Sequence, residues 1–267
     1  MKIVSLGSTL EPAFWEHVNQ NIPHYYFFAF DWKYNRKKTE IFLALEGSKI
    51  EGMMLVYDRR IVQLRGSTEA ARSLLNGLDL EKVELQSLKE HKHLVLKNYK
   101  PTLKQSHEMM LMLLHTGEEE LQMKWSTVVL DASHAKKIAS IMRDADPEYW
   151  GDTSGQQIIE GMKRGMNWFG IKVDDELVSI GSSRLTEWAG LIGAVATHEK
   201  HRNMGYATSV VSLLVERILE KLSPAMIFVL ADNLPAIRAY TRVGFKPYKT
   251  YFFMRGEKRL FTQARNH

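Results

Sequence analysis

Residues 195–208 read VATHEKHRNMGYAT, and the interpretation of the whole chain starts from this stretch. It begins in an apolar run of small residues, 191–197, which predicts a strand, and it ends in a strongly periodic segment, 205–221, which predicts a helix. A polar loop, 198–204, lies between the two. The stretch therefore predicts a strand, a loop and a helix in direct succession.

The start of such a helix is suited to binding phosphate. The first amides of a helix have no partner within it and lie at the positive end of the helix dipole, so they bind a diphosphate without lysine side chains. Gly205 lets the backbone approach the phosphates, Ala207 lets the helix pack closely on the strand, and Thr208 adds a hydroxyl donor. The string Arg-x-x-Gly-x-Ala from Arg202 is common by itself, so a second signal is needed.

The second signal lies one predicted strand further along the chain, in a predicted helix over 233–243. Asn233, Ala236 and Tyr240 stand there at positions i, i+3 and i+7. This spacing places all three on one face of the helix. The helix start at Gly205 and the helix over 233–243 are each common in proteins, but together they have the spacing expected of one binding site.

Together these residues resemble the acetyl-CoA site of the GCN5-related N-acetyltransferases, the GNAT family, in which a strand, a six-residue pyrophosphate loop and a helix hold the cofactor. The resemblance covers about residues 125–254. Within the family the chain is most similar to two-domain proteins of the FR47-like and glycine N-acyltransferase-like group. The resemblance implies an α/β fold, α+β by some schemes, with a degenerate N-terminal copy in 1–120 and a catalytic copy in 121–267.

The resemblance also implies acetyl-CoA as co-substrate and gives each matching residue a part in binding it. Backbone groups of Val195 and Thr197 would pair with the pantetheine arm as with another strand, and Asn233 would bond the same arm. Loop amides would hold the pyrophosphate. The cofactor-binding residues implied are Val195, Thr197, Arg202, Asn203, Met204, Gly205, Tyr206, Ala207, Thr208, Asn233, Ala236 and Tyr240.

The implied reaction is direct attack of a neutral primary amine on the thioester carbonyl, with no covalent enzyme intermediate. A strand amide near Val195 would bind the developing oxyanion, and the phenol of Tyr240 would protonate the departing thiolate. Tyr240 is the one residue to which we give a catalytic role. Glu187 and Asp232 are the nearest carboxylates, but each is better explained as a surface charge, so no general base is assigned.

The organisation of the chain fits this resemblance. A length of 267 residues suits two domains, and we place the boundary at 117–120, where a glycine and three acids follow the apolar run 109–114. The first half repeats the order of helices and strands in the second, which suggests a degenerate duplication. Its corresponding turn, 64–67, contains no six-residue loop, so we predict that the first domain binds no CoA.

Composition excludes several classes of function. The chain has no cysteine, which excludes disulfides, thiolate metal sites and a cysteine nucleophile and favours the reducing cytoplasm. No signal peptide or long apolar run is visible, so we predict no membrane partner. Acids are interspersed with the basic residues that give a net charge of +5, which argues against a nucleic-acid partner. His91 and His93 are expected on an exposed helix face.

The partners are less closely defined. We expect a small-molecule amine as acceptor and no bound metal, because two histidines three residues apart, His198 and His201, are more often ordinary loop residues than metal ligands. A homodimer is left open. The main rival is a non-catalytic acyl-CoA sensor that keeps the site without turnover. A nucleotide-binding phosphate loop is a weaker rival, because the chain has neither a Gly-Lys-Ser/Thr string nor a Gly-x-Gly-x-x-Gly string.

Overall fold

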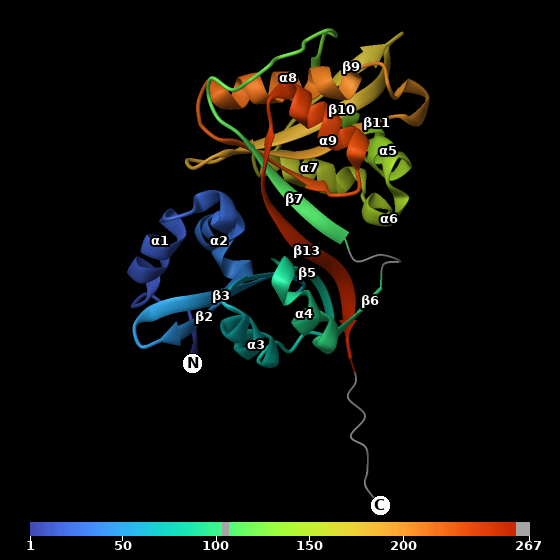
Figure 1. Cartoon of the computed structure of the whole chain (residues 1–267). Coiled ribbons are helices and arrows are strands. Elements are labelled where there is room, and N and C mark those ends of the chain that lie inside the picture. Colours follow the sequence, from blue (N-terminus) through green and yellow to red (C-terminus); the bar gives the residue numbers. More distant parts are fainter. Residues whose placement is uncertain (103–106, 260–267) are drawn as a thin grey trace, which may run out of the picture. The chain divides into compact units, whose positions relative to one another are not determined.

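The computed structural model describes residues 1–102 and 107–259, which form two compact units (Figure 1). The first unit comprises Met1–Met109 and Thr250–His267, and the second comprises Met110–Lys249. The first unit thus ends before the predicted boundary at 117–120, and it also includes the final strand of the chain. Residues 260–267, which we had placed in the second domain, lie outside the described residues.

The first unit is a mostly antiparallel sheet with helices. Its strands follow the order β1 (Lys2–Ser5), β2 (Thr39–Glu46), β3 (Lys49–Tyr57), β4 (Ile61–Gly66), β5 (Lys82–Leu88) and β13 (Lys246–Lys258), with β6 (Tyr99–Pro101) also on β13. Its helices are α1 (Glu11–Asn19), α2 (Ile22–Tyr34), α3 (Thr68–Asn76) and α4 (Lys92–Asn98), with short 3-10 turns at Arg36–Lys38 and Lys89–His91. Only β4 and β5 pair in parallel among the registers described for this unit.

The last strand explains why the end of the chain belongs to the first unit. Tyr251 to Glu257 of β13 pair with Leu88 to Lys82 of β5, so the chain's final strand completes the sheet of the first unit. Strand pairing between segments so far apart in sequence has no local signature.

Helix α2 is the largest element that the sequence pattern did not predict. It buries Tyr26, Phe28 and Ala29 and so lacks a single apolar stripe. Its start does carry a local signal, because the Asn21 side chain accepts a hydrogen bond from the amide of His24. The prediction that His91 is exposed is wrong: its side chain is 0% exposed and packs in the first unit, whereas His93 is exposed as expected.

The second unit has a six-stranded path in the order β7-β12-β11-β10-β9-β8 within the described residues. The strands are β7 (His107–Leu114), β8 (Val128–Leu130), β9 (Asn167–Val173), β10 (Glu176–Leu185), β11 (Gly190–Thr197) and β12 (Ala225–Leu230). The helices are α5 (Ala135–Ala145), α6 (Pro147–Trp150), α7 (Gly155–Lys163), α8 (Tyr206–Leu219) and α9 (Leu234–Val243), with 3-10 turns at Ala132–His134 and Glu199–His201.

The predicted elements of this unit are confirmed with small shifts at their ends. The hairpin of β9 and β10 turns at Asp174 and Asp175, whose φ angles are 49° and 63°, as a tight turn of this kind requires. Strand β8 begins only at Val128, and before it the amide of Trp125 donates to the side chain of Ser209 on α8.

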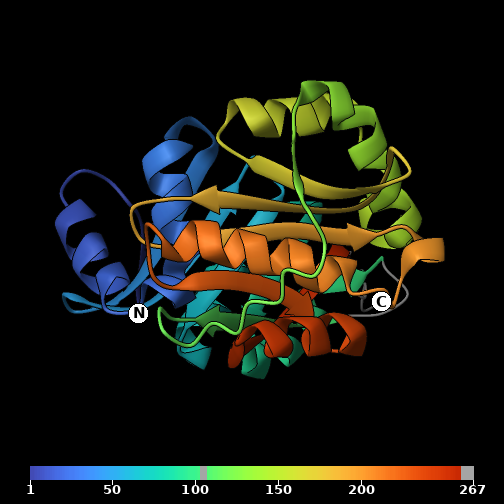
Figure 2. The ribbon, with the colours of Figure 1, turned by 90° about the horizontal axis from the view of Figure 1, so that it is seen from above.

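Helices cover both faces of the second unit's sheet. Apolar residues of α8 and α9 pack with β11 and β12 on one face, and those of α5 and α7 pack with β8 and β10 on the other. Figure 2 shows α8 in orange and the yellow-green α5 and α7 on opposite sides of the strands. In the described part of the chain, no helix combines the length and apolar character needed to cross a bilayer. Strand β11 lies between the two helical layers, and its end is the place where a site forms.

Candidate functional site

Strand β11 has an open edge. It pairs with β10 along its length but with β12 only at Gly190, Leu191 and Ile192. Strand β12 continues to Leu230, so the two parallel strands separate beyond Ile192. The backbone from Gly193 to Thr197 therefore presents an edge without a strand partner among the described residues.

A β-bulge lies where the two strands separate. On β11 the paired positions Ile192 and Val195 are three residues apart, whereas their partners on β10, Ser183 and Gly181, are two apart. The extra residue changes the direction of the strand, as bulges beside active sites commonly do. The amide of Ala194 in this bulge donates to the hydroxyl of Ser182, at 3.0 Å.

The pairing also fixes which backbone groups face the open edge. The amide of His198 donates to the carbonyl of Val178 on β10, at 2.9 Å. Because bonded and non-bonded pairs alternate along antiparallel strands, Ala196 also faces β10, and the amides and carbonyls of Val195 and Thr197 point to the other side. These are the two residues predicted to pair with pantetheine. The carbonyl of Thr197 also accepts a long contact from Nε of Arg202, at 3.4 Å.

The loop after β11 leads to an uncapped helix. Asn203 and Gly205 have φ angles of 66° and 84°, and no side chain caps α8 at Gly205. The first helical bond runs from the amide of Ser209 to the carbonyl of Gly205, at 3.0 Å. Within the described residues, the amides from Tyr206 to Thr208 have no acceptor, which leaves the positive end of the helix dipole available to an anion.

The corresponding place in the first unit is closed. Strands β4 and β5 stay paired from Ile61 to Leu64, and the Ser67 hydroxyl accepts the amide of Ala70 at the start of α3, at 3.2 Å. Ser67 is thus the N-cap of α3. The side chain of Arg65 is buried beside these strands and donates to the side-chain carbonyls of Gln63 and Gln86. This turn offers neither an open edge nor an uncapped helix.

Helix α9 places the second group of predicted residues. Asn233 is the N-cap of α9, and its side-chain oxygen accepts a hydrogen bond from the amide of Ala236, at 3.2 Å. The side-chain NH₂ group of Asn233 remains for a ligand. Tyr240 is 6% exposed and packs at 6.3 Å from the ring of Phe245. Its hydroxyl has no partner among the described residues. Burial raises the pKa of Tyr240 well above its ordinary value of 10, so the phenol stays protonated.

The two candidate bases remain without a role. Glu187 and Asp232 are both exposed. We therefore assign no general base.

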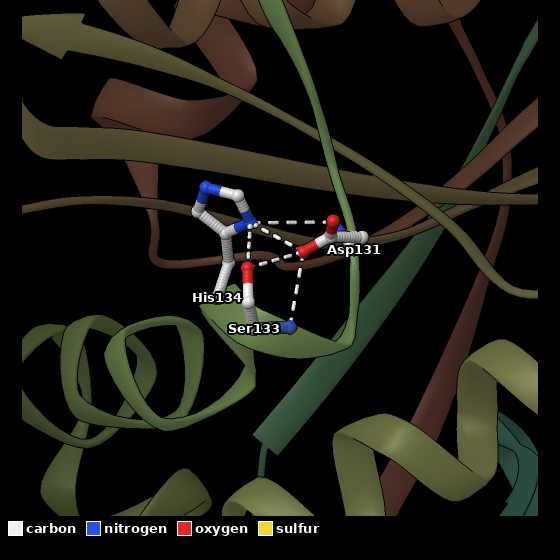
Figure 3. A network of polar contacts seen from close by, with 3 residues as sticks. All are labelled: Asp131, Ser133 and His134. Atoms are coloured by element: carbon white, nitrogen blue, oxygen red, sulfur yellow. Dashed lines mark hydrogen bonds and ion pairs between the residues drawn. The ribbon is translucent and has the colours of Figure 1, made fainter.

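An Asp-Ser-His cluster at the start of α5 has the residue types of a hydrolase triad but not the geometry (Figure 3). Nδ1 of His134 lies 2.8 Å from Asp131 and 3.2 Å from the hydroxyl of Ser133, which itself donates to Asp131 at 2.5 Å. In a catalytic triad the serine and the aspartate bond different ring nitrogens. Here bonds from Ser133 and His134 lower the pKa of Asp131 to about 2, as expected of a helix cap.

No group of three or more potential ligands that could hold a metal ion occurs within residues 1–102 and 107–259. His198 and His201 lie 5.9 Å apart between ring centroids, beside the loop.

Sequence reasoning missed Ser182 and Trp125. The hydroxyl of Ser182 is the acceptor for the bulge amide, and the indole of Trp125 donates to the carbonyl of Met204 in the loop, at 2.9 Å. Neither contact has a local sequence signal, because each joins elements that are distant along the chain.

Comparisons with known proteins agree with this geometry. Residues 169–254, which include β11, the loop, α8 and α9, match the family model of the FR47-like protein. No curated protein matches the chain.

Three solved structures illustrate the fold. An X-ray structure of a Drosophila protein has a TM-score of 0.71 at 12% identity, covering 94% of this chain and 98% of that one. A GNAT acetyltransferase from Colwellia psychrerythraea has a TM-score of 0.55 at 15% identity, covering 97% and 100%. A tandem GNAT protein from the clavulanic acid biosynthesis pathway has a TM-score of 0.51 at 13% identity, covering 82% of each chain. At these identities the likeness establishes the fold and leaves the activity open.

Proposed function

We propose that this chain, an FR47-like protein with the GNAT fold, transfers an acetyl group from acetyl-CoA to a primary amine of a small molecule. One observation carries the proposal: the open edge of β11 from Gly193 to Thr197 leads directly into the uncapped start of α8. The edge suits an amide-bearing chain and the helix start suits a diphosphate. Coenzyme A contains both groups in one molecule.

The residues of the site fit the donor in three places. The outward carbonyl of Val195 and the outward backbone groups of Thr197 would pair with the pantetheine amides as an added strand. The amides from Tyr206 to Thr208 would bind the diphosphate, with Gly205 leaving room for its approach. The NH₂ group of Asn233 is left to bond the pantetheine arm.

Acetyl-CoA, when bound, supplies an acetyl thioester that an amine can attack. The amide of Ala194 is already bonded to Ser182, so the amide of Val195 is the bulge donor that is available to the developing negative charge on the carbonyl oxygen. Tyr240 holds a proton that it can donate to the departing sulfur, because burial keeps the phenol neutral. The amine must arrive deprotonated, or lose its proton to water.

The proposal is tested by release of free thiol. The purified protein is mixed with acetyl-CoA and a panel of small primary amines, and thiol is followed with a colorimetric reagent. We expect amine-dependent release above the rate of acetyl-CoA alone for at least one amine. CoA binding without release for any amine would favour the acyl-CoA sensor, and no CoA binding would reject both functions.

The localisation, the partners and the oligomeric state of the protein stay predictions. We expect the protein in the cytoplasm, with no nucleic-acid or membrane partner. A homodimer also stays a prediction, for which sedimentation velocity is the direct measurement.

Replacing Ser182 by alanine is expected to lower kcat. The amide of Ala194 would lose its acceptor, so the bulge could relax and move the neighbouring Val195 amide. We expect a loss of up to about 10²-fold in kcat, the lower limit for removing an oxyanion donor, with little change in the Kd of CoA. Ser183→Ala is the control, since Ser183 is equally buried on β10 but makes no such bond to the bulge. Equal kcat values for the two variants would reject this role of Ser182.

The pH dependence follows from the buried phenol. A raised pKa means that the protonated form of Tyr240 persists to higher pH, so the group remains an acid throughout the range below pH 10. We expect kcat/KM to rise with pH as the amine deprotonates, and to show no decline below pH 10 caused by Tyr240. A descending limb centred below pH 10 that is absent in Tyr240→Phe would contradict the assignment.

A further inference from the structure

A segment without regular structure lies along helix α8. The amide of Gln122 donates to the hydroxyl of Ser212, at 2.9 Å, and the hydroxyl of Ser209 donates to the carbonyl of Gln122, at 3.2 Å. The amide of Trp125 donates to Ser209, at 3.3 Å. Ser209 and Ser212 are 1% and 0% exposed, so two buried hydroxyls of α8 hold this segment against the helix. We call residues 122–125 the α8 strap.

The strap ends on the loop 198–204, which precedes α8. Nε1 of Trp125 donates to the carbonyl of Met204, at 2.9 Å, and the indole packs at 4.7 Å from the ring of Tyr206. The indole nitrogen is also the nearest atom, at 3.9 Å, to the point where a Cβ on Gly205 would stand. Trp125 therefore contacts Met204 and Tyr206 and lies beside Gly205 between them.

The hydrogen bond to Met204 determines the direction of the next amide. A trans peptide is planar, and its carbonyl and amide point in opposite directions. Because the carbonyl of Met204 points to the indole, the amide of Gly205 in the same peptide points away from it. The indole thus orients the amide that precedes the free amides of α8.

This constraint matters because the loop is otherwise weakly held. Gly205 has φ of 84°, and glycine populates many other conformations. No side chain caps the helix, and the amides that follow have no acceptor among the described residues. Donors held in place before a ligand arrives bind it more tightly than donors that must be ordered during binding.

We propose that Trp125 is a positioning residue for the diphosphate of the CoA donor, which it serves by holding the Met204–Gly205 peptide in its binding orientation. The proposal rests on the proposed function. It concerns the diphosphate alone, because the contacts of Trp125 lie at the loop and the start of α8 and not at the open edge of β11.

The test compares two ligands by titration calorimetry: CoA, which carries the diphosphate, and pantetheine, which lacks it. Trp125→Phe keeps a ring against Tyr206 but removes the donor to Met204. We expect the Kd of CoA to rise about three- to tenfold, the effect of losing one neutral hydrogen bond. We expect the Kd of pantetheine to stay unchanged.

The matched control is Trp168→Phe in the same unit. Trp168 is buried, and its indole nitrogen has no hydrogen-bond partner among the described residues, so this variant removes the same atoms without removing a bond. It should bind CoA as the wild type does. Ser209→Ala gives a second test, because it loosens the strap without altering the indole, and it should weaken CoA binding and spare pantetheine.

An unchanged Kd of CoA in Trp125→Phe would overturn the proposal. An equal loss of affinity for CoA and pantetheine would overturn it too, because the indole would then support the fold as a whole. Failure of the wild type to bind CoA would instead reject the proposed function, so the two failures are distinguishable.

Discussion

Gly205→Val is expected to remove CoA binding almost entirely. Gly205 has φ of 84°, a left-handed conformation that a β-branched residue essentially never adopts. Apart from its chain neighbours, the nearest described atom to a Cβ at this position would be Nε1 of Trp125, at 3.9 Å, so the main obstacle is the backbone conformation. The loop would have to change its path, and the amides from Tyr206 to Thr208 would no longer converge on the diphosphate.

The size of the effect follows from those amides. Hydrogen bonds to a charged group contribute about 1.5–3 kcal/mol each, so losing two of them weakens binding by about 10² to 10⁴. Titration calorimetry with CoA measures it. Gly205→Asn is the control, since asparagine tolerates the left-handed region. It should bind CoA more tightly than the valine variant, and wild-type affinity in Gly205→Val would show that the loop does not hold the diphosphate.

Tyr240→Phe is expected to lower kcat by about 10² to 10⁴, the usual contribution of a positioned acid, and to leave the Kd of CoA nearly unchanged. The hydroxyl is the only group removed. It has no partner among the described residues, so the variant leaves no unpaired donor or acceptor behind. The melting temperature should therefore stay the same or rise slightly.

Single-turnover release of thiol from acetyl-CoA, with the best amine of the panel, gives the relevant rate. A substrate whose thiol is a better leaving group needs less help from an acid, so the loss should shrink with an acetyl thioester of an aromatic thiol. An undiminished rate in Tyr240→Phe would leave the buried tyrosine as a packing residue. The proposed transfer reaction would then proceed without an acid at this position.

Most elements of the second unit were predictable because their signals are local. The period of apolar residues marks α5, α7 and α8, and the paired aspartates mark the turn between β9 and β10. The strand, loop and helix around Gly205 were predictable for the same reason. Helix α2 was missed, since aromatic residues on several faces hide the helical period.

The site was predictable only in part. The residue types of the loop and the spacing of Asn233, Ala236 and Tyr240 point to the segments of the site. They do not show which tertiary contacts hold those segments in place. The bulge amide depends on Ser182, and the loop carbonyl of Met204 depends on Trp125. Both contacts join parts of the chain that only folding brings together.

The sequence by itself determined the strand, loop and helix around Gly205 and the helix that carries Asn233 and Tyr240, because helical period, caps and glycine act over a few residues. The tertiary structure decided that β13 completes the first unit, that β11 separates from β12 beyond Ile192, and that His91 is buried. Contacts between residues that are distant in sequence determine which strands pair and which side chains are buried, and alternative pairings compete with one another. No local pattern encodes the outcome of that competition.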